Sequence, residues 1–506
     1  MTAGRGRLIR DTGHAITGRV AATLLWVVLT PALLRALDAE RFGLWAVFLA
    51  LTGYFGGFDL GLSQGTLRHV AIAHAAGRAE ESSAHATFAA LGYLALGALW
   101  LVVLALAGGV VLGFLRVPAA LVPEARFLLF ASAATFAAAG VANVTVAALQ
   151  GARRFDLANL VMLAGTVAQG GGAAWALARG AGLRGLAIAV LAGWSVGGLV
   201  GMLALAAVPG FRWTGPRAAF ARAREALAFG LPMQWAAMCA TLHQHLDKFL
   251  LARWVALAAV APFEIGFRIA SAAVTLPQQF LVAVLPRAAS FEAAGQRDAL
   301  RDLYQRGDRL MMGATAVWLA VLAGGAAALL TAWIGNPDPK AIDAARGLSL
   351  AWAIALATGM GTSVARAIGR TDLEARFATV VVVVHLGLSL LLVPRWDVRG
   401  AVIATLAANA VGTVVFLVLL ARALDWPATG VLLAGKAWPA LAAVLGTLAG
   451  HGVDLAWPPA PGAAAWVRAG VVAATAGVVA TGVLFGSRAL RQELRFGWRA
   501  DPGAAG

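Results

Sequence analysis

A few ionisable side chains lie inside apolar segments long enough to cross a membrane, where a charge is costly and seldom accidental. Glu264 and Arg268 are four residues apart, so on a helix they share one face as an acid-to-base pair. At 1.5 Å per residue, Arg268 lies about 18 Å inside the expected outer boundary, near the middle of the membrane. A charge there costs about 2.5–3.5 kcal/mol. The pair can be structural, but at this depth Arg268 must face a partner or a polar space, and we predict that it is the principal functional residue.

A second pair of opposite charges is expected nearer the cytoplasmic boundary. Arg19 and Asp59 lie in the first two apolar segments, each about 10 Å from that boundary. They can form an ion pair that closes the bundle or contact a substrate, and both interpretations stay open.

A polar run ends another apolar segment. His243 and Asp247 share a helical face, whereas His243 and His245 do not, so no metal site is expected there. Lys248 can bind a ligand or extend to the membrane surface. Asn143, in a different segment, can contact a ligand or hydrogen-bond to a neighbouring helix.

The composition explains why these residues must be positioned by membrane helices. The chain has 506 residues, of which 60% are hydrophobic and only 13% are charged, about half the charged share of a soluble protein. We predict an all-α integral membrane protein with about fourteen spans of roughly 20 apolar residues. The predicted spans cover residues 13–36, 41–67, 85–114, 126–149, 157–179, 183–208, 226–249, 256–284, 309–334, 345–367, 376–394, 399–421, 433–451 and 464–486.

The net charge of +16 follows this topology. Lys and Arg on the N-terminal side of the predicted membrane outnumber those on the opposite side by about two to one, which places both termini in the cytoplasm. We therefore expect anionic lipids, not nucleic acid, as the partner of these charges. The single cysteine, Cys239, excludes an internal disulfide and a cysteine-based metal site.

The spans predict two similar six-helix lobes around a central cavity, a recurrent transporter plan, followed by two additional helices. The basic segment between the lobes is either an interfacial helix or a plain linker. The predicted parts are an N-terminal lobe at 1–210, the linker at 211–225, a C-terminal lobe at 226–425, two further helices at 426–490 and a cytoplasmic tail at 491–506.

Sequence signatures of catalysis are absent. The chain contains no P-loop, no G-x-S-x-G motif and no His/Glu spacing typical of a metal site, so we expect neither ATP hydrolysis nor enzymatic activity. No cofactor or metal is expected.

Several stretches together resemble the polysaccharide-transport branch of the multidrug/oligosaccharidyl-lipid/polysaccharide exporter superfamily, which includes the O-antigen flippases. The resemblance covers about residues 1–425. It rests on Phe42-Gly-Leu-Trp45-Ala, Asp59-Leu-Gly-Leu62 with Arg68, Leu149-Gln-Gly-Ala-Arg153-Arg-Phe155, Phe263 through Arg268 with Pro277 and Leu285-Pro-Arg287, and Ala367-Ile-Gly-Arg370-Thr-Asp.

The resemblance implies a flippase of the bacterial inner membrane that moves an undecaprenyl-pyrophosphate-linked oligosaccharide outward by alternating access. In the related lipid II flippases, arginines that match Arg268 and Arg19 line the cavity, and two extra helices resemble the last two spans here. A coupling ion (H⁺ or Na⁺), a polysaccharide polymerase and glycosyltransferases are the implied partners.

A pyrophosphate site should be cationic, yet the embedded charges balance. We assign substrate binding to Arg268, Arg19, Asp59, Glu264, His243, Asp247, Lys248 and Asn143. Either some of the acids are paired structurally, or the cationic surplus comes from Arg153, Arg154 and Arg366 at the cavity mouth.

Two alternatives remain. A cation-coupled multidrug exporter of the same fold predicts acids dominating the cavity and twelve spans. A membrane enzyme of glycan assembly requires a catalytic constellation or a large outer loop, and the sequence shows neither.

Overall fold

The computed structural model describes residues 25–433, 435–459, 461–487 and 491, without the side chains of 228–233, 272–280, 282, 283 and 286. Arg19 therefore lies outside the described residues. Within the described ranges all regular secondary structure is helical, which confirms the predicted all-α fold. The helices form two compact units, Met1–Val260 and Ala261–Gly506. The predicted lobe boundary at 211–225 precedes this division.

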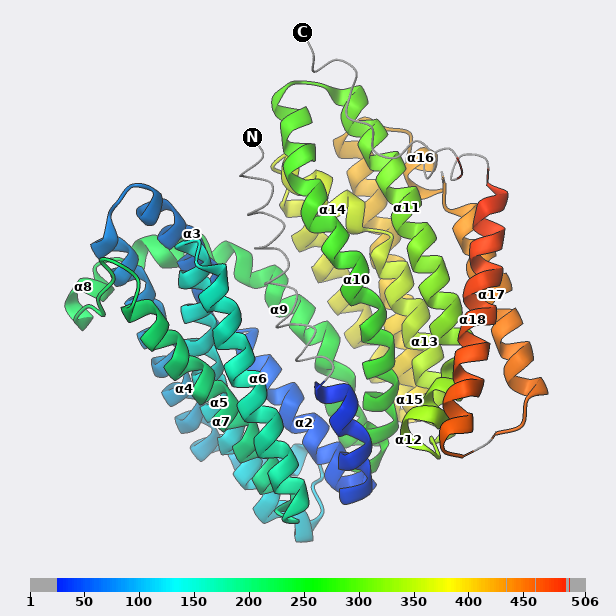
Figure 1. Cartoon of the computed structure of the whole chain (residues 1–506), viewed down its shortest axis with the longest axis horizontal. Coiled ribbons are helices and arrows are strands. Elements are labelled where there is room, and N and C mark those ends of the chain that lie inside the picture. The colour runs from blue at the N-terminus through cyan, green and yellow to red at the C-terminus, as the bar shows by residue number, and fades with distance from the viewer. Residues whose placement is uncertain (1–24, 434, 460, 488–490, 492–506) are drawn as a thin grey trace. The chain divides into compact units, whose positions relative to one another are not determined.

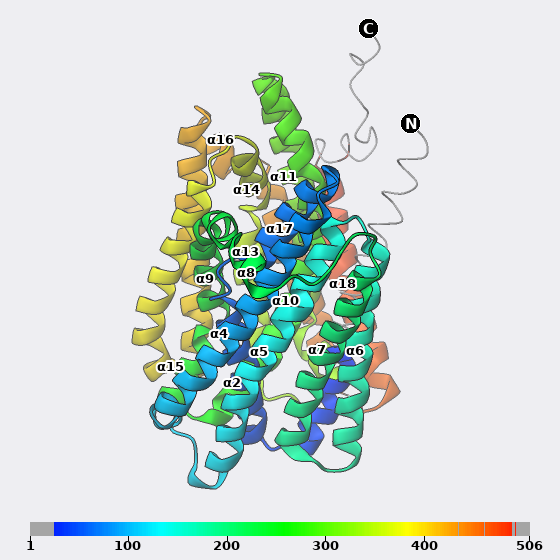
Figure 2. The same cartoon turned by 90° about the vertical axis from the view of Figure 1, so that its left-hand side faces the viewer.

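Unit one begins, within the described residues, with the helix Leu25–Ala36. Its other helices are α2 (Ala39–Gly56), α3 (Leu62–Ala75), α4 (Ala79–Phe114), η1 (Ala119–Leu121), α5 (Val122–Gly151), α6 (Phe155–Ala178), α7 (Gly182–Ala206), α8 (Pro216–Phe220), α9 (Ala223–Trp254) and η2 (Leu257–Ala259). Helices α4, α5, α7 and α6 pack side by side in that order (Figures 1 and 2).

Small residues allow these helices to approach closely, as expected where lipid gives no hydrophobic drive for helix association. A Cβ on Gly193 of α7 would lie 2.9 Å from the backbone oxygen of Gly165 on α6. A Cβ on Gly201 would meet the hydroxyl of Thr145 on α5. The glycines thus set the spacing of α7 against both neighbours.

The segment predicted as one span at 41–67 is broken, and that prediction is wrong. Helix α2 ends at Gly56 and α3 starts at Leu62, with Leu60 and Gly61 in the left-handed region (φ 56° and 67°). The break is stabilised because the Asp59 carboxylate accepts a hydrogen bond from the Gly61 N–H at 2.9 Å. A side chain thereby satisfies a backbone donor that the interrupted helix leaves open.

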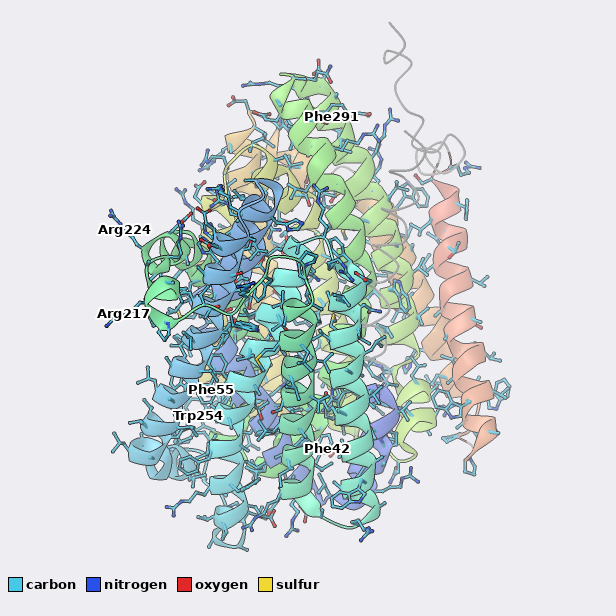
Figure 3. The ribbon with its side chains drawn as sticks, turned by 60° about the vertical axis from the view of Figure 1, so that its left-hand side comes forward. Phe42, Phe55, Arg217, Arg224, Trp254 and Phe291 are labelled. Carbon is cyan, nitrogen blue, oxygen red and sulfur yellow. The ribbon has the colours of Figure 1, made fainter. Side chains whose placement is uncertain are left out.

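The linker at 211–225 contains only the five-residue helix α8, which starts at Pro216. The backbone N–H groups of Arg212 and Thr214 donate to Ser83 and Thr87 on α4, so the linker lies along that helix. Figure 3 shows Arg217 and Arg224 extending away from the helices of this unit. Its predicted position at the membrane interface stays a prediction.

Unit two contains α10 (Val260–Ala293), α11 (Arg297–Gly324), α12 (Ala326–Ile334), α13 (Pro339–Leu356), α14 (Gly359–Ala367), α15 (Asp372–Ala423), α16 (Ala428–Leu432), α17 (Ala437–Ala456) and α18 (Ala463–Gly486). Segment 285–308, predicted as a long connection, is mostly helical. Helix α10 continues to Ala293 and α11 begins at Arg297, because good helix formers fill this stretch. The turn needs only Gly295, at φ 66°.

Eight helices of the described residues are long and apolar enough to span a membrane, or nine if the α11–α12 pair, bent by 62°, counts as one span. The predicted number of fourteen is therefore not confirmed. Helix α15 alone covers two predicted spans, because a kink at Asp397 (φ 56°) after Pro394 separates its halves. Helices α9 and α10 are 32 and 34 residues long but are not among the eight. They carry most of the predicted site residues.

Helices α17 and α18, which correspond to the two additional predicted spans, pack on α11 (Figure 1). Their shared core consists of alanines, including Ala320, Ala442, Ala476 and Ala480. A Cβ on Gly446 would lie 2.7 Å from both the Ala320 Cβ and the Ala476 backbone oxygen. The interface therefore depends on small side chains rather than on large apolar ones.

We expect Gly446→Val to destabilise the protein by about 1–3 kcal/mol, the usual cost of adding atoms to a filled interface. Gly452→Val on the same helix is the matched control, since a Cβ there meets nothing within 4 Å. Thermal unfolding in detergent measures both variants. Equal melting temperatures for the two would contradict the close packing of α17 on α11 and α18.

Candidate functional site

Asp59 lies at the centre of a polar cluster at the α2–α3 break. Its carboxylate accepts hydrogen bonds from the Tyr93 hydroxyl at 2.7 Å and from the Gly61 N–H. The Tyr93 and Ser63 hydroxyls are 2.8 Å apart. These neutral donors stabilise the carboxylate without a cation, although Asp59 was expected to face Arg19, which lies outside the described residues.

Helix α9 closes the same cluster from the other side. The Gln234 amide donates to the backbone oxygen of Gly57 and accepts from the Gly61 N–H at 3.0 Å. A Cβ on Gly57 would lie 3.1 Å from the Thr241 side chain. One side chain of α9 thus pairs a carbonyl and an N–H that the break leaves out of the helices.

We predict that Tyr93→Phe destabilises unit one by about 1.5–3 kcal/mol, since the variant removes a hydrogen bond to a charged group. Tyr304→Phe is the matched control, because the Tyr304 hydroxyl is buried with no hydrogen-bond partner among the described residues. Chemical or thermal unfolding of both variants measures the difference. A Tyr93→Phe variant as stable as Tyr304→Phe would rule out the proposed role of this hydrogen bond.

The predicted residues of α9 are packed against α2. His243, Asp247 and Lys248 are all buried, with exposures of 9%, 3% and 2%. His245 stacks near the Tyr54 ring at 6.0 Å, and its Nδ1 lies 3.5 Å from the Lys248 ammonium. Because Lys248 is 2% exposed, its side chain does not extend to the surface as the alternative interpretation assumed.

Glu264 and Arg268 form the predicted ion pair on α10. Arg268 Nε donates to the Glu264 carboxylate at 2.9 Å, and the two side chains are 15% and 6% exposed. Charges this well buried hold together because the remaining alternative, an unpaired charge, is far more costly. The pair makes Glu264 the residue that orients the Arg268 guanidinium.

The arginines expected at a cavity mouth are not equivalent. Arg154 donates two hydrogen bonds to Asp156, whose carboxylate raises the pKa of the guanidinium above its ordinary value. Arg366 is paired with Glu374 at 2.7 Å, whereas Arg153 is exposed at φ 58°. Exposed pairs of this kind contribute about 0–1 kcal/mol, so an incoming anion can displace the carboxylates.

Asn143 is exposed on α5 although it lies in the middle of an apolar helix. Tyr93, Ser63 and Gln234 were missed from the sequence. The only sequence signal for them is the Gly-Gly-Phe-Asp run at 56–59, which marks a helix break but does not indicate which side chains stabilise it.

Comparison with known proteins places these features in a family. A family model described as "Polysaccharide biosynthesis protein" matches residues 8–292. No curated protein sequence matches the chain.

Solved structures resemble the fold at low sequence identity. The chain is similar to the lipid II flippase MurJ in an inward closed conformation, with 12% identity, a TM-score of 0.69, and coverage of 94% of this chain and 99% of that one. It is similar to an inward-facing multidrug resistance MATE transporter of the MOP superfamily, with 17% identity, a TM-score of 0.67, and coverage of 81% and 94%. The VcmN MATE transporter of Vibrio cholerae gives 17%, 0.59, 83% and 97%.

Proposed function

The chain belongs to the polysaccharide biosynthesis protein family, within the multidrug/oligosaccharidyl-lipid/polysaccharide exporter superfamily, and we propose on this premise that it flips a lipid-linked oligosaccharide across the bacterial inner membrane. The family match over residues 8–292 carries the proposal. The similar solved structures are a flippase and drug transporters, which supports transport rather than catalysis.

Arg268 supplies the main contact with the pyrophosphate of the substrate in this proposal. A guanidinium has five N–H groups and binds phosphate oxygens in pairs. One of these groups, Nε–H, is held by Glu264, which fixes the plane of the guanidinium before the substrate arrives. Pre-orientation of this kind lowers the entropic cost of binding.

The remaining predicted residues have supporting roles. Lys248 and His243 add polar groups from α9, and Asn143 offers an amide from α5 to the glycan. Arg153, Arg154 and Arg366 attract the anionic headgroup, and Arg19 acts as a second cation. The two predicted lobes alternate access to the substrate while the isoprenoid tail stays in lipid, driven by a coupling ion such as H⁺ or Na⁺. Polymerase and glycosyltransferases then use the same lipid-linked glycan.

Native mass spectrometry of the purified protein tests the choice of substrate. We expect binding of an undecaprenyl-pyrophosphate-linked oligosaccharide at least about 10-fold tighter than binding of undecaprenyl monophosphate, because one phosphate and the glycan contacts are lost. A cationic drug such as ethidium should not compete. Preferential binding of the drug, displaced by Na⁺ or protons, would instead identify a cation-coupled multidrug exporter.

A further inference from the structure

Three residues far apart in the sequence meet at one end of unit one. His69 comes from the second half of α3, His85 from the first turns of α4 and Glu225 from the first turn of α9. One ligand atom from each lies within 4.8 Å of the other two. Neither the family resemblance nor the proposed transport uses these residues.

The geometry of the cluster differs from that of a hydrogen-bonded one. His69 Nδ1 is 3.5 Å from one Glu225 oxygen, and His85 Nε2 is 3.6 Å from the other. A hydrogen bond would be about 2.7–3.2 Å. Two ligand atoms each about 2.1 Å from a tetrahedral metal are separated by about 3.4 Å. Both separations therefore suit the edges of a metal coordination shell better than direct contacts.

Burial and ring orientation also suit a metal. The imidazoles are stacked with their centroids 4.5 Å apart and their planes 9° apart, and they direct one nitrogen each toward the same carboxylate. The His69 and His85 side chains are 8% and 4% exposed, whereas Glu225 is 52% exposed. The site is thus closed by protein on the histidine side and open to solvent on the carboxylate side, where water can complete the shell.

Neighbouring charges leave the carboxylate accessible. Arg222 lies 3.5 Å from Glu225, but its shorter contact, at 3.1 Å, is with Glu81. Arg78 also pairs with Glu81. Since Glu81 holds Arg222, Glu225 can turn toward a metal without leaving that arginine unpaired.

We propose that His69, His85 and Glu225 form a site for a transition-metal ion of the Zn²⁺ type. Two imidazole nitrogens and one carboxylate are a set that Zn²⁺ binds well, whereas Mg²⁺ and Ca²⁺ require oxygen ligands. A metal held there fastens the first turn of α9 to α3 and α4. Binding draws the two imidazole nitrogens toward the carboxylate by side-chain rotation.

Titration of the tag-free, EDTA-treated full-length protein in detergent tests the proposal, with Co²⁺ as a spectroscopic probe and Zn²⁺ in calorimetry. We expect one equivalent of Zn²⁺, d–d absorption bands with Co²⁺, and no heat from Mg²⁺. Glu225→Gln and His85→Gln should each weaken Zn²⁺ binding by at least about 100-fold. The controls His74→Gln and Glu80→Gln, exposed residues of the same elements, should stay within two-fold.

A second measurement keeps the proposal falsifiable if His85→Gln folds poorly. Glu225 is half-exposed, so Glu225→Gln should fold, and Zn²⁺ should raise the melting temperature of the wild type but not of this variant. Zn²⁺ binding equal in wild type and Glu225→Gln would overturn the site. So would a melting temperature that depends on pH between 5 and 8 but not on Zn²⁺, since the cluster would then bind protons instead.

Discussion

Replacing Arg268 by alanine is expected to reduce export of the lipid-linked glycan by about 10- to 100-fold, since the variant loses charge-assisted hydrogen bonds worth about 1.5–3 kcal/mol. Arg268→Lys keeps the charge but not the bidentate geometry, so it should retain an intermediate rate. Polymer at the cell surface, normalised to the amount of protein in the membrane, measures the effect. Arg306→Ala is the matched control, because Arg306 and Asp302 form an exposed i, i+4 pair.

A double variant separates a transport role from a structural one. Arg268→Ala alone leaves the buried Glu264 without its ion-pair partner, which also destabilises the protein. Glu264→Gln combined with Arg268→Gln removes both charges and should restore stability but not export. If export recovers together with stability, Arg268 acts only through the ion pair, and its place in the transport path is wrong.

Breaking the ion pair between the last two helices should have the largest effect on stability. Asp454 on α17 and Arg468 on α18 are 2.8 Å apart and about 5% exposed, and Arg468 also donates to the Asp454 backbone oxygen. Asp454→Ala leaves a buried guanidinium without its counter-charge, which costs about 3–5 kcal/mol. We expect this variant to unfold at a clearly lower temperature and to accumulate less in the membrane.

The matched control is an exposed pair of the same charges. Arg399 and Asp343 are 2.9 Å apart with Arg399 at 74% exposure, so Asp343→Ala should cost at most about 1 kcal/mol. Asp454→Leu with Arg468→Met should recover most of the stability, because apolar residues replace both charges. Equal melting temperatures for Asp454→Ala and Asp343→Ala would show that the buried pair does not stabilise α17 against α18.

The sequence predicts the helices well because apolar length is a local property. The Glu264–Arg268 pair is also predictable, since two residues four apart on a helix must meet. The interruption between Gly56 and Leu62 was not predicted. Its stabilisation depends on Gln234, more than 170 residues away, and on Tyr93, neither of which has a recognisable spacing to Asp59.

The histidine cluster was invisible for the same reason. His69, His85 and Glu225 follow no metal-binding spacing, so only the packing of α3, α4 and α9 brings them together. Conversely, the arginines assigned to a cavity mouth were identified by charge alone. The sequence does not reveal that Asp156 and Glu374 already pair with Arg154 and Arg366, because these contacts depend on side-chain rotamers at the helix ends.

Flipping in reconstituted vesicles tests the central claim most directly. The purified protein is placed in liposomes with a fluorescent undecaprenyl-pyrophosphate-linked oligosaccharide, and a lectin or glycosidase added outside reports how much substrate reaches the outer leaflet. The account predicts protein-dependent movement that Arg268→Ala slows by about 10- to 100-fold and Arg306→Ala leaves unchanged. Movement no faster than in protein-free vesicles, from a preparation that melts cooperatively, would contradict it.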